Sequence, residues 1–147
     1  MPMFICPLFS GSKGNSAFIA SNDTAILIDA GVSMSNITRA LGDVNADFDI
    51  IKGIVLTHEH IDHIRSIAVI SRRKDIPIYA NEETWRAILS MKSFNDIPFK
   101  NTICYDGDFD IGSLHLSPIK VSHDAADPVG FSVFNDNKRA VVISDTG

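Results

Sequence analysis

The chain has 147 residues, enough for one domain with a hydrophobic core, and its 45% apolar and 21% charged residues are typical of a soluble globular protein. A net charge of −5 argues against a protein that binds nucleic acid mainly through a basic surface. No apolar run approaches the ~20 residues of a membrane-spanning helix, and the apolar start lacks the basic residues of a signal peptide. We therefore expect a cytoplasmic protein whose two cysteines, Cys6 and Cys104, are reduced and buried.

Short apolar and β-branched runs in the first part of the chain are typical of β-strands. We expect strands at 4–9, 17–20, 25–28, 53–56 and 76–79. Turn signals separate the first three of these, with Gly11 and Gly14 after the first and the run Ser21-Asn22-Asp23 after the second.

Three segments between and after these strands have the apolar spacing of amphipathic helices. The first covers 33–41 and is expected to end at Gly42, and the second is expected to run without a break over 61–73. Asn81 is the expected N-cap of the third helix, because asparagine accepts hydrogen bonds from the free amides of a first turn. The side chains of this third helix that we expect to face the core are Trp85, Ile88 and Leu89.

Strand signals dominate the rest of the chain. They fall around Ile103 and at 114–121, 130–134 and 140–143. With strands at both ends of the chain and helices in the middle, the pattern predicts an α/β (α+β layered) domain with largely antiparallel or mixed sheets.

The segment Thr57-His58-Glu59-His60-Ile61-Asp62-His63 contains three histidines and two carboxylates and directly follows an apolar strand. His58 and His60 would point in nearly opposite directions on a helix but in the same direction on an extended chain. They can therefore share one metal at the end of the strand. Asp62 and His63, at the bend into the next helix, can then face a second metal. Imidazole and carboxylate ligands suit Zn²⁺, Mn²⁺ or Fe²⁺.

Two other interpretations of this segment are weaker. It is not the H-E-x-x-H helix of zinc proteases, because Asp62 stands four residues after His58 where a histidine is required. It could be a polar loop that merely caps a helix, but three histidines and an aspartate at this spacing argue for metal binding.

The pattern H-x-H-x-D-H after an apolar strand and a threonine resembles the metallo-β-lactamase fold superfamily. Asp29 in Leu27-Ile28-Asp29-Ala30-Gly31 is similar to the aspartate of the first motif of that family, which supports the metal loop. His123 resembles the third-motif histidine, a ligand of the first metal, and Asp145 resembles the fourth-motif carboxylate that bridges both metals. The resemblance implies the N-terminal portion of an αββα sandwich with mixed β-sheets.

Two further segments narrow this resemblance. They are Ser10-Gly11-Ser12-Lys13-Gly14-Asn15-Ser16 and His123-Asp124-Ala125-Ala126-Asp127-Pro128-Val129-Gly130-Phe131, and both resemble the YycJ (WalJ) group of the superfamily. Members of this group are similar to nucleases and phosphodiesterases of the same fold. The resemblance therefore implies a two-metal phosphodiesterase or nuclease that acts on DNA or RNA through a metal-bridging hydroxide.

The resemblance also implies a role for each matching residue. His58, His60 and His123 hold the first metal, Asp62 and His63 hold the second, and Asp145 bridges the two. Asp62 is in addition the expected catalytic residue, which orients the attacking hydroxide or accepts its proton. Lys13, between two glycines, is either a contact for a substrate phosphate or an ordinary turn lysine.

One element of the family pattern is missing. A fifth-motif histidine completes the second metal site in the family, and this sequence has no histidine after His123. We therefore expect 1–147 to be a single metallo-β-lactamase-like domain whose C-terminal part is missing. Apolar strands such as 141–143 would then lack cover, and the chain would form a homo-dimer, exchange segments or have low stability.

Three functions remain open from the sequence. The first is the two-metal phosphodiesterase, and the second is a hydrolase of thioester, lactam or lactone substrates on the same fold, because the metal cluster serves both. The third is an inactive fragment with an incomplete second metal site. The group resemblance favours the first.

Overall fold

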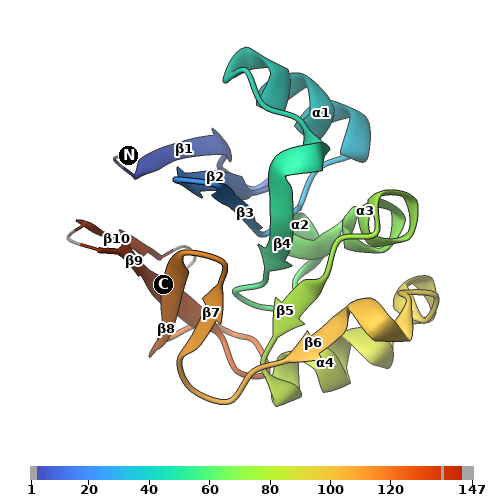
Figure 1. Ribbon diagram of the computed structural model, residues 1–147. Helices are drawn as coiled ribbons and strands as arrows, with labels where there is room; N and C mark the ends of the chain where they lie inside the picture. The colour runs from blue at the N-terminus through green and yellow to red at the C-terminus, as the bar shows by residue number, and fades with distance from the viewer. Residues whose placement is uncertain (1–2, 137, 144–147) are drawn as a thin grey trace.

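The computed structural model describes residues 3–136 and 138–143, which form two stacked β-sheets with helices against the outer face of the larger sheet (Figure 1). The larger sheet has the strand order β1-β2-β3-β4-β5-β6, and the smaller has the order β10-β9-β8-β7. The strands are β1 (Phe4–Phe9), β2 (Ser16–Ser21), β3 (Thr24–Ile28), β4 (Ile51–Val55), β5 (Ile78–Ala80), β6 (Thr102–Cys104), β7 (Phe109–Ile111), β8 (Leu114–Lys120), β9 (Val129–Asn135) and β10 (Lys138–Val142). The helices are α1 (Met34–Asp43), α2 (Ile61–Ile64), α3 (Ile67–Lys74) and α4 (Glu82–Leu89), with short 3₁₀ turns at Phe48–Ile50, Lys92–Phe94 and Phe99–Asn101.

The larger sheet is mixed, as the sequence predicts. β1, β2 and β3 pair antiparallel, whereas β3, β4, β5 and β6 pair parallel. The carboxyl ends of parallel strands lie at the same edge of a sheet, so the residues that follow these strands lie near one another. Asp29 follows β3, Thr57 lies two residues after β4, and Asn81 follows β5. This edge is where the metal-ligand candidates lie.

The smaller sheet is fully antiparallel, and its inner face closes the second half of the core. One apolar cluster lies between the helices and the larger sheet and includes the fully buried Ile37, Ile54 and Ile70. A second lies between the two sheets and includes Phe131 and Leu116. The two sheets therefore stack as expected for the predicted layered sandwich, with β4 contributing to both clusters.

The segment 61–73, predicted as one helix, is two helices. α2 ends at Ile64 and α3 begins at Ile67. At the break, both the backbone N–H and the hydroxyl of Ser66 donate hydrogen bonds to the carbonyl of Ala30, at 3.0 and 3.3 Å. A tertiary contact thus replaces the helical hydrogen bond at this position, which apolar spacing cannot reveal.

The first helix also differs from its prediction, because it continues through Gly42 to Asp43. The left-handed residue that ends it is Asn45, with φ of 58°, and the amide of Ala46 donates to the carbonyl of Leu41 at 2.9 Å. Asparagine tolerates this conformation, so the helix can end there without using the glycine.

The third predicted helix is α4, and its side-chain prediction is partly wrong. Asn81 caps it as expected, accepting from the amide of Thr84 at 2.9 Å. Trp85 and Ile88 are buried, but Leu89, the last residue of the helix, is 48% exposed.

A short strand, the two cysteines and the length of the helices remain to be compared with the sequence-based expectations. β7 was not predicted, because its three residues are too short for a periodic signal. The cysteines are free, as expected, but they are not buried: Cys6 is half-buried and Cys104 is exposed. Among the helices that the structure describes, none combines the length and apolar character that crossing a bilayer requires.

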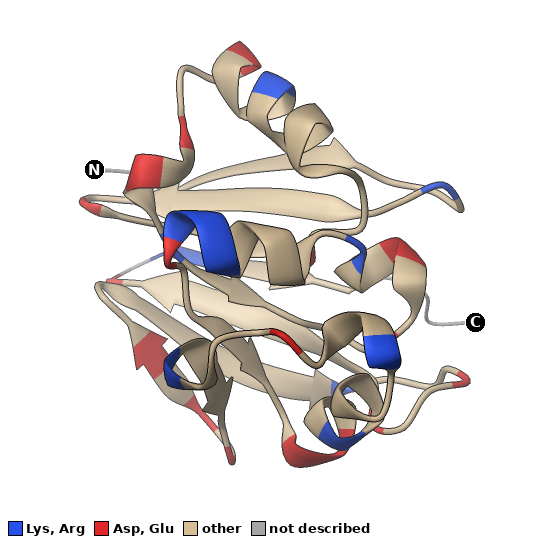
Figure 2. Cartoon of the chain, turned by 90° about the vertical axis from the view of Figure 1, so that its right-hand side faces the viewer, with Lys and Arg blue, Asp and Glu red and all other residues tan. Residues whose placement is uncertain are grey.

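Charged residues are scattered over the molecule (Figure 2). The longest basic segment in this view is the last turn of α3, with Arg72, Arg73 and Lys74. Arg72 is paired with Asp96 at 2.5 Å, and this turn is where basic side chains complement the helix dipole. These basic side chains therefore have a structural role at the end of α3.

Candidate metal centre

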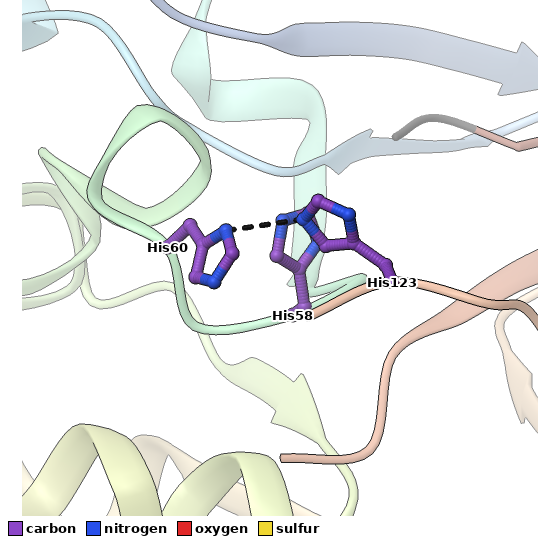
Figure 3. A group of neighbouring side chains, drawn as sticks. All are labelled: His58, His60 and His123. Atoms are coloured by element: carbon purple, nitrogen blue, oxygen red, sulfur yellow. Dashed lines mark hydrogen bonds between the residues drawn. The ribbon is translucent and has the colours of Figure 1, made fainter. Parts of the chain in front are cut away.

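The segment from Thr57 to His60 leaves β4 as extended chain and enters α2 at Ile61. His60 still has extended backbone angles, with φ of −66° and ψ of 145°. The side chains of His58 and His60 therefore project to the same side, as the sequence predicts for an extended chain. His123, from the loop between β8 and β9, approaches from the smaller sheet (Figure 3).

These three histidines form a compact cluster, called the His cluster below. One ring nitrogen from each of His58, His60 and His123 lies within 4.8 Å of the others. Nε2 of His123 lies 3.1 Å from Nδ1 of His60, the contact drawn in Figure 3. The ring of His58 is buried, whereas the other two are half-buried. Three imidazoles from two distant segments thus converge at an accessible point at the edge of the sandwich.

Asp29 makes buried hydrogen bonds to Thr57 and His63, which flank the first two histidines of the His cluster in sequence. Its Oδ1 accepts from the backbone N–H of Thr57 at 2.8 Å, and its Oδ2 accepts from the Thr57 hydroxyl at 2.7 Å. The same Oδ2 lies 2.6 Å from Nδ1 of His63. Asp29 therefore ties the end of β3 to both ends of the segment Thr57 to His63.

This network also sets the tautomers of two histidines. The Thr57 hydroxyl gives its proton to Asp29, so at 3.0 Å from Nδ1 of His58 it acts as the acceptor, and that nitrogen carries the proton. His63 likewise presents an Nδ1 proton to Asp29. In both rings Nε2 is then the nitrogen with the lone pair, which is the form that binds a metal.

His63 directs its Nε2 toward Asp62, with 3.7 Å between that nitrogen and Oδ2 of Asp62. Both residues lie in α2, and the backbone N–H of His63 donates to the carbonyl of His60. The imidazole of His63 is also close to the His cluster, with 4.0 Å between its ring centre and that of His58. The structure thus brings Asp62 and His63 together beside the His cluster.

Asn15 is a residue of this region that sequence reasoning did not single out. Its side-chain amide lies 3.2 Å from Nε2 of His63 and 3.4 Å from Oδ2 of Asp62. Its backbone N–H donates to the carbonyl of Asp62 at 2.8 Å, and its carbonyl accepts from Gly31. Its place in the run that begins Ser10-Gly11-Ser12 was the available signal, because a glycine turn lets the following residue approach another backbone closely.

Gly31 explains how closely these segments pack. A Cβ atom added at Gly31 would lie 1.7 Å from the carbonyl oxygen of Asp62. The preceding backbone is also unusual, since Asp29 has a φ of 67°. The chain after β3 therefore packs directly against the backbone of α2. Only glycine, which has no Cβ atom, fits at position 31.

The remaining predicted site residues lie elsewhere. Lys13 is exposed in the loop two residues before Asn15, and Asp145 lies outside the described residues. His115 is on β8, away from the His cluster, where Asp110 and Asp108 contact its two ring nitrogens at 2.6 and 3.1 Å. It is therefore not placed to replace a fifth-motif ligand.

The fold and this site define the class of the protein. Residues 24–147 match the family model described as the beta-lactamase superfamily domain, and the chain belongs to this family. The stacked sheets agree with solved structures of the metallo-β-lactamase fold. One is the protein YhfI from Bacillus subtilis, with a TM-score of 0.73 and 18% identity over 96% of this chain and 62% of that one. Another is MEM-A1, a subclass B3 enzyme from a soil metagenome, with a TM-score of 0.71 and 19% identity over 95% and 58% of the two chains.

Within the family, the chain is similar to two curated relatives. It is 34% identical to the exodeoxyribonuclease YycJ of Bacillus anthracis, over 100% of this chain and 56% of that protein. It is 35% identical to the exodeoxyribonuclease WalJ of Streptococcus pneumoniae, over 95% of this chain and 53% of that protein. The likeness to the YycJ (WalJ) group is thus confirmed, and the chain spans about half the length of these relatives.

Proposed function

We propose that this chain forms the metal-binding part of a metal-dependent hydrolase that cleaves phosphodiester bonds in nucleic acid. The observation that carries the proposal is the His cluster, in which His58, His60 and His123 place ring nitrogens within 4.8 Å of one another. Neutral imidazoles that face one another in this way are typical ligands of Zn²⁺, Mn²⁺ or Fe²⁺.

The residues present fit a metal ion, and the fit rests on their hydrogen bonds. Asp29 and Thr57 hold the Nδ1 protons of His63 and His58. A histidine that donates one N–H to a carboxylate or hydroxyl in this way is the usual support of a metal ligand.

In the proposed mechanism, His58, His60 and His123 would hold a first ion, and Asp62 and His63 would contribute to a second site that lacks its fifth-motif histidine. Asp145, which lies outside the described residues, would be a carboxylate shared by both sites. A bound divalent ion supplies positive charge that polarises a phosphodiester and lowers the pKa of water. Asp62, whose side chain is 26% exposed, is accessible from solvent and would accept the proton of the attacking water. Asp29 would keep His63 in the correct tautomer throughout.

The substrate class rests on the relatives. The two relatives described above are named exodeoxyribonucleases, so we propose DNA as the first substrate to test and RNA as the second. Lys13, exposed near the metal centre, is the proposed contact for a substrate phosphate. Hydrolysis of a thioester, lactam or lactone would use the same ligands, but the likeness to lactamase structures is one of fold.

An assay with several substrates tests this proposal. The chain is loaded with Mn²⁺ or Zn²⁺ and incubated with end-labelled DNA, RNA of the same sequence, a thioester and a lactam. We expect cleavage of nucleic acid that is lost in His58→Ala. His115→Ala is the matched control, because this histidine lies on β8 away from the His cluster and should leave the cleavage unchanged.

Each outcome decides between the alternatives. Hydrolysis of the thioester or lactam without cleavage of nucleic acid would reject the nuclease proposal in favour of a carbonyl hydrolase. Hydrolysis of none of the substrates by the metal-loaded chain would favour the inactive-fragment interpretation. Cleavage that persists in His58→Ala would indicate a contaminating nuclease.

A further inference from the structure

Glu59 lies between two histidines of the His cluster, but its carboxylate contacts a distant part of the chain. The backbone of His60 is extended, and on an extended chain successive side chains point to opposite sides, so Glu59 is expected to point away from the neighbouring imidazoles. Its Oε2 accepts a hydrogen bond of 3.0 Å from the backbone N–H of Ala126. Its Oε1 is shielded from solvent and has no hydrogen-bond partner among the described residues. The side chain is therefore directed toward the 121–128 loop.

The 121–128 loop carries His123 and contains neither helix nor strand. Its two ends are joined by a hydrogen bond from the N–H of Val121 to the carbonyl of Pro128, at 3.3 Å. Inside the loop, the N–H of Ala125 donates to the carbonyl of His123 at 3.0 Å. The next residue, Ala126, makes the contact to Glu59. The Glu59–Ala126 bond thus joins the loop of one ligand to the segment of the other two.

We propose that Glu59 is a positioning residue that holds the 121–128 loop against the ligand segment and so places the His123 imidazole beside His58 and His60. The inference rests on the metal centre of the proposed function. A hydrogen bond to an ionised carboxylate is roughly twice as strong as one between neutral groups. Such a bond can therefore hold in place a loop that has no helix or strand. Loss of such outer contacts typically lowers metal affinity by about 10–100-fold.

The test measures binding of Co²⁺ alone, because the visible absorption of this ion reports the number and type of its ligands. Glu59→Ala removes the acceptor and is expected to weaken Co²⁺ binding by about 10–100-fold and to change the spectrum as His123 is lost. Glu59→Gln keeps a side-chain oxygen that can accept from Ala126 and should recover most of the affinity. Glu82→Ala is the control, because Glu82 is an exposed glutamate of α4 paired with Arg86, and it should bind Co²⁺ as the unmodified chain does.

Ala126→Pro tests the same bond from the other side, because proline has no backbone N–H. If the bond is the cause, this substitution should weaken binding as Glu59→Ala does. The double variant should then lose little more than either single variant, since both remove one interaction. Additive losses would show that the two residues act separately and would overturn the inference.

Hydrogen exchange separates this inference from the metal proposal. The amide of Ala126 should exchange slowly in the unmodified chain and in Glu59→Gln, and rapidly in Glu59→Ala, with or without metal. Equal exchange in the unmodified chain and Glu59→Ala, or equal Co²⁺ affinity and spectrum in the two, would overturn the role of Glu59. An unmodified chain that binds no Co²⁺ would instead reject the proposed metal centre, and the exchange rates would still decide whether Glu59 holds the loop.

Discussion

Asp29 Oδ2 lies 2.6 Å from Nδ1 of His63, and both side chains are buried where β3 and β4 end side by side. The same carboxylate accepts from the backbone and the hydroxyl of Thr57, at 2.8 and 2.7 Å. One buried acid thus links the two strand ends and fixes the protonated nitrogen of a candidate ligand. We therefore expect the candidate metal centre to depend on this link as well as on the proposed ligands.

Replacing Asp29 by asparagine should therefore affect both stability and metal binding. The substitution exchanges one acceptor oxygen for an N–H₂ group, which cannot accept from Thr57 or His63. Leaving a buried donor without an acceptor costs about 1–3 kcal/mol, so we expect Asp29→Asn to lower the free energy of unfolding by that amount. Urea denaturation measures it. Asp49→Asn, at an exposed position, should change it little.

Two glycines give substitutions with opposite expected effects. A Cβ at Gly31 would meet the backbone of Asp62 at 1.7 Å, whereas nothing lies within 4 Å of a Cβ at Gly42. Gly31→Ala should therefore displace the ligand segment and lower the free energy of unfolding by about 1–3 kcal/mol or more. Gly42→Ala, inside α1, should raise it by about 0.5–1 kcal/mol. Equal effects of the two in urea denaturation would contradict this packing.

His115 should titrate above the range usual for histidine. Its ring is hydrogen-bonded by Asp110 and Asp108, and these bonds raise the pKa of His115 while the bond to His115 lowers the pKa of Asp108. The raised pKa gives a stabilising contribution that is complete below the unfolded pKa of about 6.5 and is lost as the pH rises through the folded pKa. The lowered pKa of Asp108 also gives a stabilising contribution. This contribution is present above the unfolded pKa of Asp108 and is lost as the pH falls through the folded pKa.

Titration of His115 by NMR checks this arrangement. The midpoint should lie above about 6.5 and should fall in Asp110→Asn, which removes the carboxylate that lies 2.6 Å from Nδ1 of His115. A midpoint that is unchanged by Asp110→Asn would show that the aspartate contact does not persist in solution.

The edge strand β10 is the place where self-association is expected. Val141 and Ile143 are 56% and 45% exposed, and β10 is the last strand at its edge of the smaller sheet. An exposed apolar edge strand can pair with another chain. The homo-dimer thus stays a prediction: light scattering should show association that Val141→Lys reduces and that Ile50→Lys, at another exposed apolar position, does not. A monomer at every concentration would contradict it.

The sequence predicted most strands, the mixed sheet and the shared direction of His58 and His60, because all three leave local patterns. β2 and β3 are separated by a turn signal, and the spacing of His58 and His60 matches the extended chain that follows β4. The features that were missed depend on tertiary contacts. The break between α2 and α3 arises because Ser66 bonds to Ala30, and Asn15 reaches His63 across 48 residues of sequence.

The position of His123 in the His cluster could not be predicted without the fold. His123 lies 63 residues after His60, and only the stacking of the smaller sheet on the larger brings its Nε2 to 3.1 Å from that ring. Nothing in local spacing predicts this distance, and the third-motif role of His123 came from the resemblance to the family. The role of Glu59 is of the same kind, since its hydrogen-bond partner is 67 residues away.

Measurement of metal content shows whether the His cluster binds a metal ion. The chain is incubated with Zn²⁺, dialysed against metal-free buffer and analysed for zinc by atomic emission, alongside His123→Ala and His115→Ala, with circular dichroism to establish that each is folded. We expect the unmodified chain and His115→Ala to retain zinc and His123→Ala to lose it. No zinc in the unmodified chain, or equal retention in folded His123→Ala, would contradict the metal centre.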